Sequence, residues 1–218
     1  MVAYKKIKKF LFNSLFAVSR KELKKQLRGM DSVLDIGCGP NSPVSEAKKL
    51  YGFYSVGTDI YQTAIDQSKQ NGVHDDHHCV DVLDLVRTFG EKSFDAVVAL
   101  EIIEHLEKSK GEQFLILLNK IARKKIILST PNGFLPCTVF PGENPHQEHL
   151  SGWTVDELER EGYRCIGTVG LKPIYGERGD IVFRPQWFWS KIGAFSQLIT
   201  YHLPRLGFGL FCYKKITH

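Results

Sequence analysis

Short apolar runs alternate with amphipathic segments along the chain up to Pro131. The apolar runs predict five strands, at Ser32–Ile36, Tyr54–Gly57, His78–Val80, Phe94–Leu100 and Lys125–Ser129. Between them, apolar residues recur at helical spacing and predict helices at Ser45–Tyr51, Thr63–Gln70 and Ser109–Ile121. Strands that alternate with helices at this spacing form right-handed βαβ units. We therefore expect a parallel sheet with helices on both faces.

The pattern changes after Pro131. It predicts, in order, a long loop over 131–150, a helix over Thr154–Glu161, a strand over Tyr163–Val169, an aromatic-rich helix over 185–201 and a closing strand over Leu206–Tyr213. Thr154 and Glu157 have the spacing of a capping box, which marks the start of the second of these elements. At the other end of the chain, residues 4–28 predict one or two amphipathic helices.

Composition narrows the class of protein. The chain has 218 residues, of which 43% are hydrophobic and 24% charged, and this is typical of a single globular α/β domain. Its five cysteines are scattered and include no CxxC pair, which argues against a disulfide scaffold and against a structural zinc site. We therefore expect a reducing, cytoplasmic location and no metal. The histidine-rich segment 74–78 is predicted to be a solvated polar loop.

Basic residues are concentrated at the N-terminus. Residues 1–28 hold nine Lys or Arg side chains and one acid, so the rest of the chain is mildly acidic. Such a segment could contact an anionic membrane through residues 4–28, or it could be the solvated face of a helix. Both interpretations stay open from the sequence.

The sharpest local signal is the stretch from Val33 to Pro40, where a buried strand leads into a glycine turn. Glycines at 37 and 39 lack Cβ atoms, so a ligand can lie against the backbone. A dinucleotide-binding loop would have a third glycine at the position that Ser42 occupies. Asp35 is a poor neighbour for a pyrophosphate and a good one for an ammonium group. The loop therefore favours a nucleoside that carries an amino acid over a nicotinamide dinucleotide.

These residues resemble the glycine-loop motif of class I S-adenosylmethionine-dependent methyltransferases. The resemblance covers about residues 30–133 and rests on five ordered motifs: VLDIGCG at 33–39, VGTDI at 56–60, CVDVLD at 79–84, FDAVVALEIIEHL at 94–106 and IILSTPNG at 126–133. The fourth motif resembles the ubiquinone-biosynthesis-like enzymes of this group. The resemblance implies a Rossmann-like, doubly wound sheet of seven mostly parallel strands, with the last strand antiparallel.

The resemblance also implies a set of cofactor-binding residues. It places the methionine moiety near Asp35, Gly37, Cys38 and Gly39, the ribose hydroxyls on Asp59 beside Ile60, the adenine on Asp81 and Val82, and Glu101 at the ligand edge. The predicted positions of these residues agree with the general rule that ligands of open α/β sheets bind outside the carboxyl ends of the strands. The competing role for the carboxylates is helix capping or loop solvation.

Methyl transfer requires alignment of a nucleophile and, for a hydroxyl acceptor, a route for its proton. The candidate bases are His105, which follows the fourth strand, and His146 and His149 in or just beyond the proline-rich loop. His149 is the first choice. The competing role for each is that of a surface or helix-end histidine.

The sequence says less about the acceptor. DNA amino-methyltransferases carry an Asn/Asp-Pro-Pro-aromatic turn after strand four, whereas this chain has Leu100-Glu101-Ile102-Ile103, so DNA is not expected. The resemblance favours O-methylation of a small-molecule, sugar or lipid-like acceptor. An RNA or protein methyltransferase and a non-catalytic S-adenosylmethionine-binding module remain the alternatives. We expect a helical cap at 1–29 and a methyltransferase domain at 30–218, with acceptor-side segments at 131–150 and 170–201. The sequence does not indicate an oligomeric state.

Overall fold

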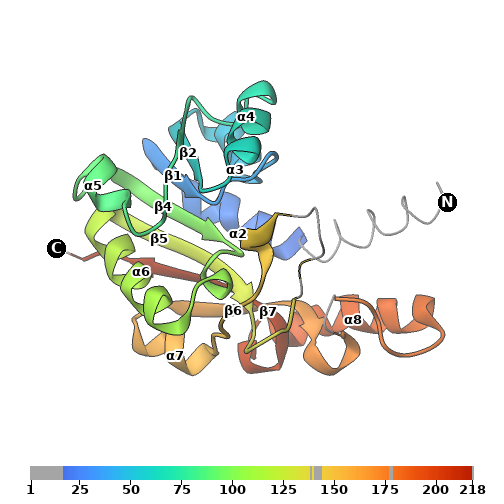
Figure 1. Ribbon diagram of the computed structural model, residues 1–218. Coiled ribbons are helices and arrows are strands. Elements are labelled where there is room, and N and C mark those ends of the chain that lie inside the picture. Colours follow the sequence, from blue (N-terminus) through green and yellow to red (C-terminus); the bar gives the residue numbers. More distant parts are fainter. Residues whose placement is uncertain (1–16, 138, 140–143, 177–178, 218) are drawn as a thin grey trace.

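The structure is a computed structural model that describes residues 17–137, 139, 144–176 and 179–217 (Figure 1). In these residues the fold is one seven-stranded sheet with strand order β3-β2-β1-β4-β5-β7-β6. The strands are β1 (Ser32–Ile36), β2 (Tyr54–Asp59), β3 (Asp76–Cys79), β4 (Phe94–Leu100), β5 (Ala122–Pro131), β6 (Arg164–Leu171) and β7 (Gly207–Lys215). The pairs among β1 to β5 are parallel, and β7 runs antiparallel to both of its neighbours, β5 and β6. The predicted fold class is confirmed.

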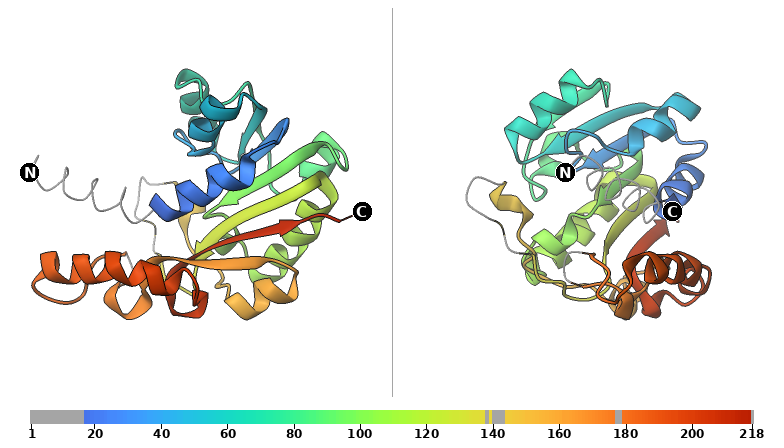
Figure 2. Two further views of the ribbon diagram at one scale, coloured as in Figure 1. Left: turned by 180° about the vertical axis from the view of Figure 1, so that it is seen from behind. Right: turned by 90° about the vertical axis from the view of Figure 1, so that its right-hand side faces the viewer.

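Helices cover both faces of the sheet, as predicted (Figure 2). The α-helices of the described residues are α2 (Ala17–Leu27), α3 (Val44–Tyr51), α4 (Gln62–Gln70), α5 (Leu85–Phe89), α6 (Lys108–Ile121), α7 (Val155–Arg160) and α8 (Gln186–Thr200). Short 3-10 turns are η1 (Ile103–His105), η2 (Pro145–Gln147), η3 (Lys172–Ile174) and η4 (Pro204–Leu206).

The two faces of the sheet bury separate apolar cores. Successive strand residues point to opposite faces, so Leu34 of β1 packs with residues of α6 and α7, whereas Val33 packs with residues of α2 and α3. Strands buried on both faces read as continuous apolar runs, which is why β1 and β4 have the limits that the sequence predicts.

Element limits differ from prediction where charged residues continue a strand. β5 and β7 pair from Lys125↔Lys215 to Pro131↔Gly209, so backbone pairing extends β7 beyond the apolar stretch. Helix α7 begins with the predicted capping box of Thr154 and Glu157. Helix α5 was not predicted, because five residues are too few to display an amphipathic period.

The histidine-rich segment 74–78 is not the solvated loop that its composition predicts. Strand β3 begins at Asp76 rather than at His78, and His74 is buried. Gly57 of β2 provides the space, since a Cβ there would lie 2.5 Å from His74 Cδ2. One side chain of this polar segment, His74, is therefore buried, which its composition does not indicate.

The described part of the N-terminal segment is helix α2. Its Leu23 and Leu27 are buried against the sheet, and residues 1–16 lie outside the described residues. Arg20 and Lys24 both pair with Glu46 of α3, at 3.4 and 2.8 Å, so part of the basic face is neutralised within the fold. None of the described helices combines the length and the apolar character needed to cross a bilayer.

Helix α8 lies on β6 and extends away from the sheet in both views (Figures 1 and 2). Gly167 and Gly170 of β6 permit this approach, because a Cβ at either position would overlap main-chain atoms of α8. At its C-terminal end, Tyr201 donates a 2.9 Å hydrogen bond to Glu22 of α2. The helix is thus anchored at one end, and apolar side chains of its remainder stay exposed.

Candidate active site

A cleft of about 980 Å³ opens at the carboxyl ends of the central strands. Nearly all predicted site residues line it: Asp35, Gly37, Cys38, Gly39, Asp59, Ile60, Asp81, Val82, Glu101, His105 and His146. His149 is not part of the lining and stands beside His105, with ring centroids 4.9 Å apart. The residues that the family resemblance implies for the cofactor therefore line one cleft.

The glycine loop crosses from β1 to the end of β2. Cys38 N–H donates to the Thr58 carbonyl at 2.9 Å, and Gly39 N–H donates to Asp59 Oδ2 at 3.1 Å. Gly37 and Gly39 have φ values of 64° and 54°, which favour glycine. A Cβ on Gly39 would meet no heavy atom within 4 Å, so this position faces open space. This backbone is free to approach a ligand.

Gly37 also has a packing role, besides the predicted approach of a ligand to its backbone. A Cβ there would overlap the side chain of Ile102, which follows β4. Its lack of a side chain therefore lets the segment after β4 pack against the glycine loop. Ile102 was not among the predicted site residues.

Asp59 organises the second strand end. Besides Gly39 N–H, its carboxylate accepts a 2.9 Å hydrogen bond from Tyr61 N–H. Each carboxylate oxygen has two lone pairs, so the group retains acceptor capacity toward the cleft. This placement fits a carboxylate that receives hydroxyl donors from a ligand.

The third strand end presents a more exposed wall. Asp81 is exposed and accepts a 2.8 Å hydrogen bond from Leu83 N–H, which is the turn-capping role named as its alternative. Ile60 is 41% exposed and Val82 is half-buried, and both line the cleft. Together they provide an apolar surface next to a carboxylate.

Asp35 is buried beneath the glycine loop. Its Oδ2 lies 3.1 Å from His74 Nε2, and His74 Nδ1 lies 3.1 Å from Ser55 Oγ. His74 was missed because its segment reads as polar and exposed. Part of the Asp35 carboxylate is thus engaged with the protein behind the cleft.

The Cys38 side chain is shielded from solvent. It is buried with its Sγ 3.9 Å from Ser68 Oγ. Burial, reinforced by the negative charge of Asp35, raises the pKa of the Cys38 thiol to about 12. The group therefore stays a neutral thiol, and the cofactor-binding role of Cys38 remains a prediction.

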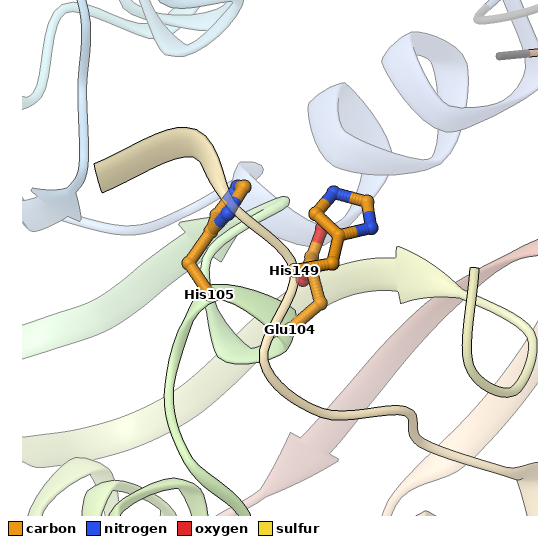
Figure 3. Close-up of side chains that lie close together, drawn as sticks. All are labelled: Glu104, His105 and His149. Atoms are coloured by element: carbon orange, nitrogen blue, oxygen red, sulfur yellow. The ribbon is translucent and has the colours of Figure 1, made fainter. Parts of the chain in front are cut away.

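Two histidines from separate parts of the chain meet at one wall of the cleft (Figure 3). His105 belongs to η1, directly after β4, and its Nδ1 lies 3.0 Å from the Glu148 carbonyl. The Nδ1 of His149 lies 2.6 Å from the Leu135 carbonyl. A carbonyl accepts only from N–H, so each Nδ1 carries the proton and each neutral ring has its lone pair at Nε2. Burial lowers the pKa of His105, which favours this neutral form.

Main-chain hydrogen bonds hold the His149 segment against η1. The N–H groups of Leu150 and Ser151 both donate to the Glu104 carbonyl, at 2.8 and 3.0 Å. Trp153 Nε1 donates to Ser151 Oγ at 3.1 Å, and its buried ring fills the space left by Gly111 of α6. The contact between the two histidines is therefore built into the fold.

Two carboxyl groups lie beside the histidines, the half-buried Glu101 and the buried Glu104. Glu101 has a φ of 54° and its Oε1 accepts a 2.6 Å hydrogen bond from Ser129 Oγ. Glu104 is 2% exposed, and its carboxyl group lies beside the side chains of Glu101 and Thr130. Burial raises the pKa of Glu101; burial and then the charge of Glu101 raise that of Glu104 well above its usual range. Glu104 was not predicted, although the EIIEH pattern after strand four displays it.

His146 stands apart from this group. It is exposed in η2, where its N–H donates to the Asn144 side chain at 3.0 Å, and it lines the cleft. The structure thus brings together two of the three predicted histidines and leaves the third on the rim.

Comparison with known proteins agrees with this geometry. Residues 34–125 match the family model of a methyltransferase domain. No curated protein sequence matches the chain.

Solved structures share the architecture. The PH0226 protein from Pyrococcus horikoshii OT3 is 22% identical, and the two structures superimpose with a TM-score of 0.50. The match covers 56% of this chain and 58% of that protein, which is less than two thirds of its length. A SAM-dependent methyltransferase from Archaeoglobus fulgidus is 20% identical, with 95% and 99% covered and a TM-score of 0.54. Phosphoethanolamine N-methyltransferase 2 from Haemonchus contortus, in complex with S-adenosyl-L-methionine, is 13% identical, with 96% and 56% covered and a TM-score of 0.60.

The site fits S-adenosylmethionine on its own residues. The backbone at Gly39 is open, Asp59 keeps acceptor capacity at the end of β2, and the cleft is large enough for a nucleoside with an amino acid attached. The matched methyltransferase domain spans these strand ends. Residues 34–125 thus match a methyltransferase domain, and the fold and the residues of the cleft agree with S-adenosylmethionine as the cofactor.

Proposed function

We propose that the enzyme methylates a hydroxyl group of a small-molecule or lipid-like acceptor. The observation that carries this proposal is the cleft itself, which joins the cofactor loop at Gly39 to the paired rings of His105 and His149. Bound S-adenosylmethionine supplies the methyl group, and the acceptor hydroxyl gives up its proton. The protein must therefore position that hydroxyl group and provide a route for its proton.

His105 and His149 are the proposed groups for this task. Their protonated Nδ1 atoms are held by the carbonyls of Glu148 and Leu135, so both rings have fixed orientations. Fixed orientation is the main requirement for groups that position a nucleophile. His146, exposed on the rim, is proposed as a contact to the acceptor as it enters.

The cofactor half of the proposal assigns the ribose hydroxyls to Asp59, with Asp35, Gly37 and Gly39 near the methionine moiety and Asp81, Val82 and Ile60 near the adenine. Titration calorimetry with S-adenosylhomocysteine tests it. We expect Asp59→Ala to weaken binding by roughly 10- to 100-fold, since a hydrogen bond to a charged group contributes about 1.5–3 kcal/mol. Asp66→Ala is the matched control, because Asp66 lies exposed on α4 and bonds only Gln62 in the described residues. Equal affinity in both variants would refute the assignment, and binding of NAD instead would refute the cofactor site.

The acceptor class is tested with methyl-labelled S-adenosylmethionine and a small-molecule, lipid and macromolecule extract. The proposal predicts label in the small-molecule or organic fraction, in a linkage that resists mild base as an ether does. Nuclease-sensitive or protease-sensitive label in the acid-insoluble fraction would instead support the alternative RNA or protein acceptor.

A lipid-like acceptor is supported by the apolar surface of α8. Trp187, Phe195 and Leu198 are 65%, 72% and 65% exposed. Helix α2, whose Glu22 accepts the hydrogen bond from Tyr201 at the end of α8, lines with its basic residues a groove of about 550 Å³ that Glu46 and Tyr51 of α3 complete. Exposed aromatics near cationic side chains are typical of segments that lie at a bilayer interface.

Vesicle co-sedimentation tests this contact. We expect binding to vesicles with anionic lipid at low salt, and loss of binding in a Trp187→Ser/Phe195→Ser variant. Ile116→Ser is the control, because Ile116 is 57% exposed on α6 and away from α8. If wild-type protein stays in the supernatant, the membrane contact is wrong and the soluble small-molecule acceptor remains.

A further inference from the structure

Three metal-ligating side chains converge at the wall of the cleft. One carboxylate oxygen of Glu104 and one ring nitrogen each of His105 and His149 all lie within 4.8 Å of one another (Figure 3). An ion about 2.1 Å from each ligand needs ligand atoms roughly 3–4 Å apart, so small side-chain rotations complete such a site. The sequence, read for CxxC pairs and histidine runs, predicts no metal here.

The carboxylate of Glu104 is the second observation that points to a cation. Glu104 is 2% exposed, and its carboxyl group lies beside the side chains of Glu101 and Thr130, neither of which carries a positive charge. No Lys or Arg of the described residues forms an ion pair with it, whereas buried carboxylates are normally paired or coordinate a metal. The side chain is aimed into the space between the two imidazole rings (Figure 3).

The two histidines are arranged as metal ligands usually are. Each ring has its Nδ1–H engaged by a backbone carbonyl, of Glu148 for His105 and of Leu135 for His149. Such a bond fixes the tautomer and the ring orientation and leaves Nε2 as the donor atom to a metal. The main-chain bonds from Leu150 and Ser151 to the Glu104 carbonyl hold the two ligand segments together.

We propose that Glu104, His105 and His149 bind a divalent first-row transition metal ion. Two imidazoles and one carboxylate suit Mn²⁺, Fe²⁺, Co²⁺ or Zn²⁺, whereas Mg²⁺ and Ca²⁺ prefer oxygen ligands throughout. Three protein ligands leave coordination positions for oxygen atoms of another molecule. His105 lines the cleft, so those positions are adjacent to the ligand space.

The proposed ion would bind the acceptor directly. Its open positions would take the acceptor hydroxyl oxygen, and a neighbouring oxygen where the acceptor has one, and would favour loss of the hydroxyl proton to water. His149 then acts as a ligand instead of a free base. This role rests on the proposed function; the binding of the ion does not.

The test uses the tag-free full-length chain and Co²⁺ as the probe, without acceptor or cofactor. Equilibrium dialysis with elemental analysis should find a single tightly held ion, with visible absorption bands from nitrogen-ligated Co²⁺. Glu104→Gln and His149→Ala should each weaken binding by more than the roughly 10- to 100-fold that loss of an outer-shell partner costs. His78→Ala is the control: it removes an exposed imidazole that pairs with Asp76 at 3.0 Å, and binding should stay at the wild-type level.

Two results would overturn the metal site. One is wild-type protein that holds no Co²⁺, and the other is affinity that both ligand variants leave unchanged. Circular dichroism and S-adenosylhomocysteine binding establish that each variant is folded. Should a variant fail to fold, pulsed electron paramagnetic resonance of Mn²⁺-loaded wild-type protein decides, because coupling to two imidazole nitrogens is required and its absence refutes the site. Since no acceptor is present, none of these outcomes depends on whether the acceptor class is right.

Discussion

Two buried carboxyl groups, Asp95 and Glu104, stand at opposite ends of β4, and their surroundings differ. At the amino end, Asp95 is 3% exposed; its Oδ1 lies 2.9 Å from Arg123 Nε and its Oδ2 2.7 Å from Lys124 Nζ. Asp31 N–H donates to it as well, at 3.1 Å. Past the carboxyl end, Glu104 is equally buried, but its neighbours Glu101 and Thr130 carry no positive charge.

The difference separates a structural site from a functional one. Removing a carboxylate from water is unfavourable unless ion pairs and hydrogen bonds replace the lost hydration. The fold supplies those partners for Asp95 and ties the starts of β1, β4 and β5 together. For Glu104 it supplies a neighbouring acid, Glu101, and two oriented imidazoles. A group left in that state is expected to find its partner in a ligand.

The largest expected effect is on turnover in Glu104→Gln. This variant keeps the shape of the side chain and removes its charge. We expect methyl transfer to fall by roughly 100- to 1000-fold, since a metal contributes several kcal/mol of charge stabilisation and about 1.4 kcal/mol corresponds to tenfold. Initial rates with labelled S-adenosylmethionine measure it.

The matched variant at the other end of β4 is Asp95→Asn, whose turnover per folded molecule should equal that of wild type. Equal losses of turnover in the two variants would break the distinction between the two ends of the strand. Unchanged turnover in Glu104→Gln would remove Glu104 from the active site.

The next largest effect is on stability, and here Asp95→Asn should have the larger effect of the two variants. Asp95→Asn should lower the free energy of unfolding by about 1–2 kcal/mol, because a charged hydrogen-bonded group is lost while the half-exposed Arg123 and Lys124 regain water. Urea unfolding at pH 7 measures this. Glu104→Gln should leave stability unchanged or raise it, because it replaces a buried acid whose ionisation burial and Glu101 disfavour by a neutral amide of the same shape.

The lowered pKa of Asp95 also predicts how that stability difference changes with pH. Burial alone would raise the pKa of Asp95, but the hydrogen bonds from Lys124 and Asp31 and the charge of Arg123 lower it overall. A depressed folded-state pKa gives stability that is fully present above the unfolded value of about 4 and is lost as the pH falls through the folded value. Wild type and Asp95→Asn should therefore converge in acid, and a constant difference down to pH 2 would contradict the ion-pair explanation.

Sequence reasoning reached the cofactor half of the site and stopped short of the acceptor half. The cofactor half depends on strand ends, and apolar runs locate those ends within a few residues. Asp59, for example, follows directly from the end of the second run. Gly37 lines the cleft as expected, but its contact with Ile102 could not be predicted, because the two residues meet only in the folded chain.

The acceptor half depends on a long-range return of the chain. Glu104 and His149 are separated by a loop without a periodic pattern, and what joins them is main-chain hydrogen bonding from Leu150 and Ser151. Main-chain partners leave no signature in side-chain composition. The same limit explains His74, which is buried because Gly57 leaves room for it.

A smaller effect is expected from Gly111→Ala, which disturbs the acceptor half without touching a ligand. The new Cβ would lie 2.5 Å from Cζ2 of the buried Trp153 ring. Overpacking costs about 1–3 kcal/mol, and the helix propensity of alanine returns about 1 kcal/mol, so we expect a net loss near 1 kcal/mol. Because Trp153 bonds Ser151, Co²⁺ affinity should fall as well, whereas S-adenosylhomocysteine affinity should not. A parallel loss of both affinities would mean that the two halves of the site are not independent.

The smallest effect separates burial from pairing. Asp156 on α7 pairs with Arg205, as Asp95 pairs with Arg123, but both side chains of this pair are about two-thirds exposed to water. Exposed ion pairs gain little, because water and salt screen them and ordering two side chains costs entropy. Asp156→Asn should therefore keep the wild-type urea midpoint, turnover and Co²⁺ affinity. If its midpoint fell as far as that of Asp95→Asn, pairing alone would account for the stability at the amino end of β4. The lack of a cationic partner for Glu104 among the described residues would then be a more direct sign of function than its burial.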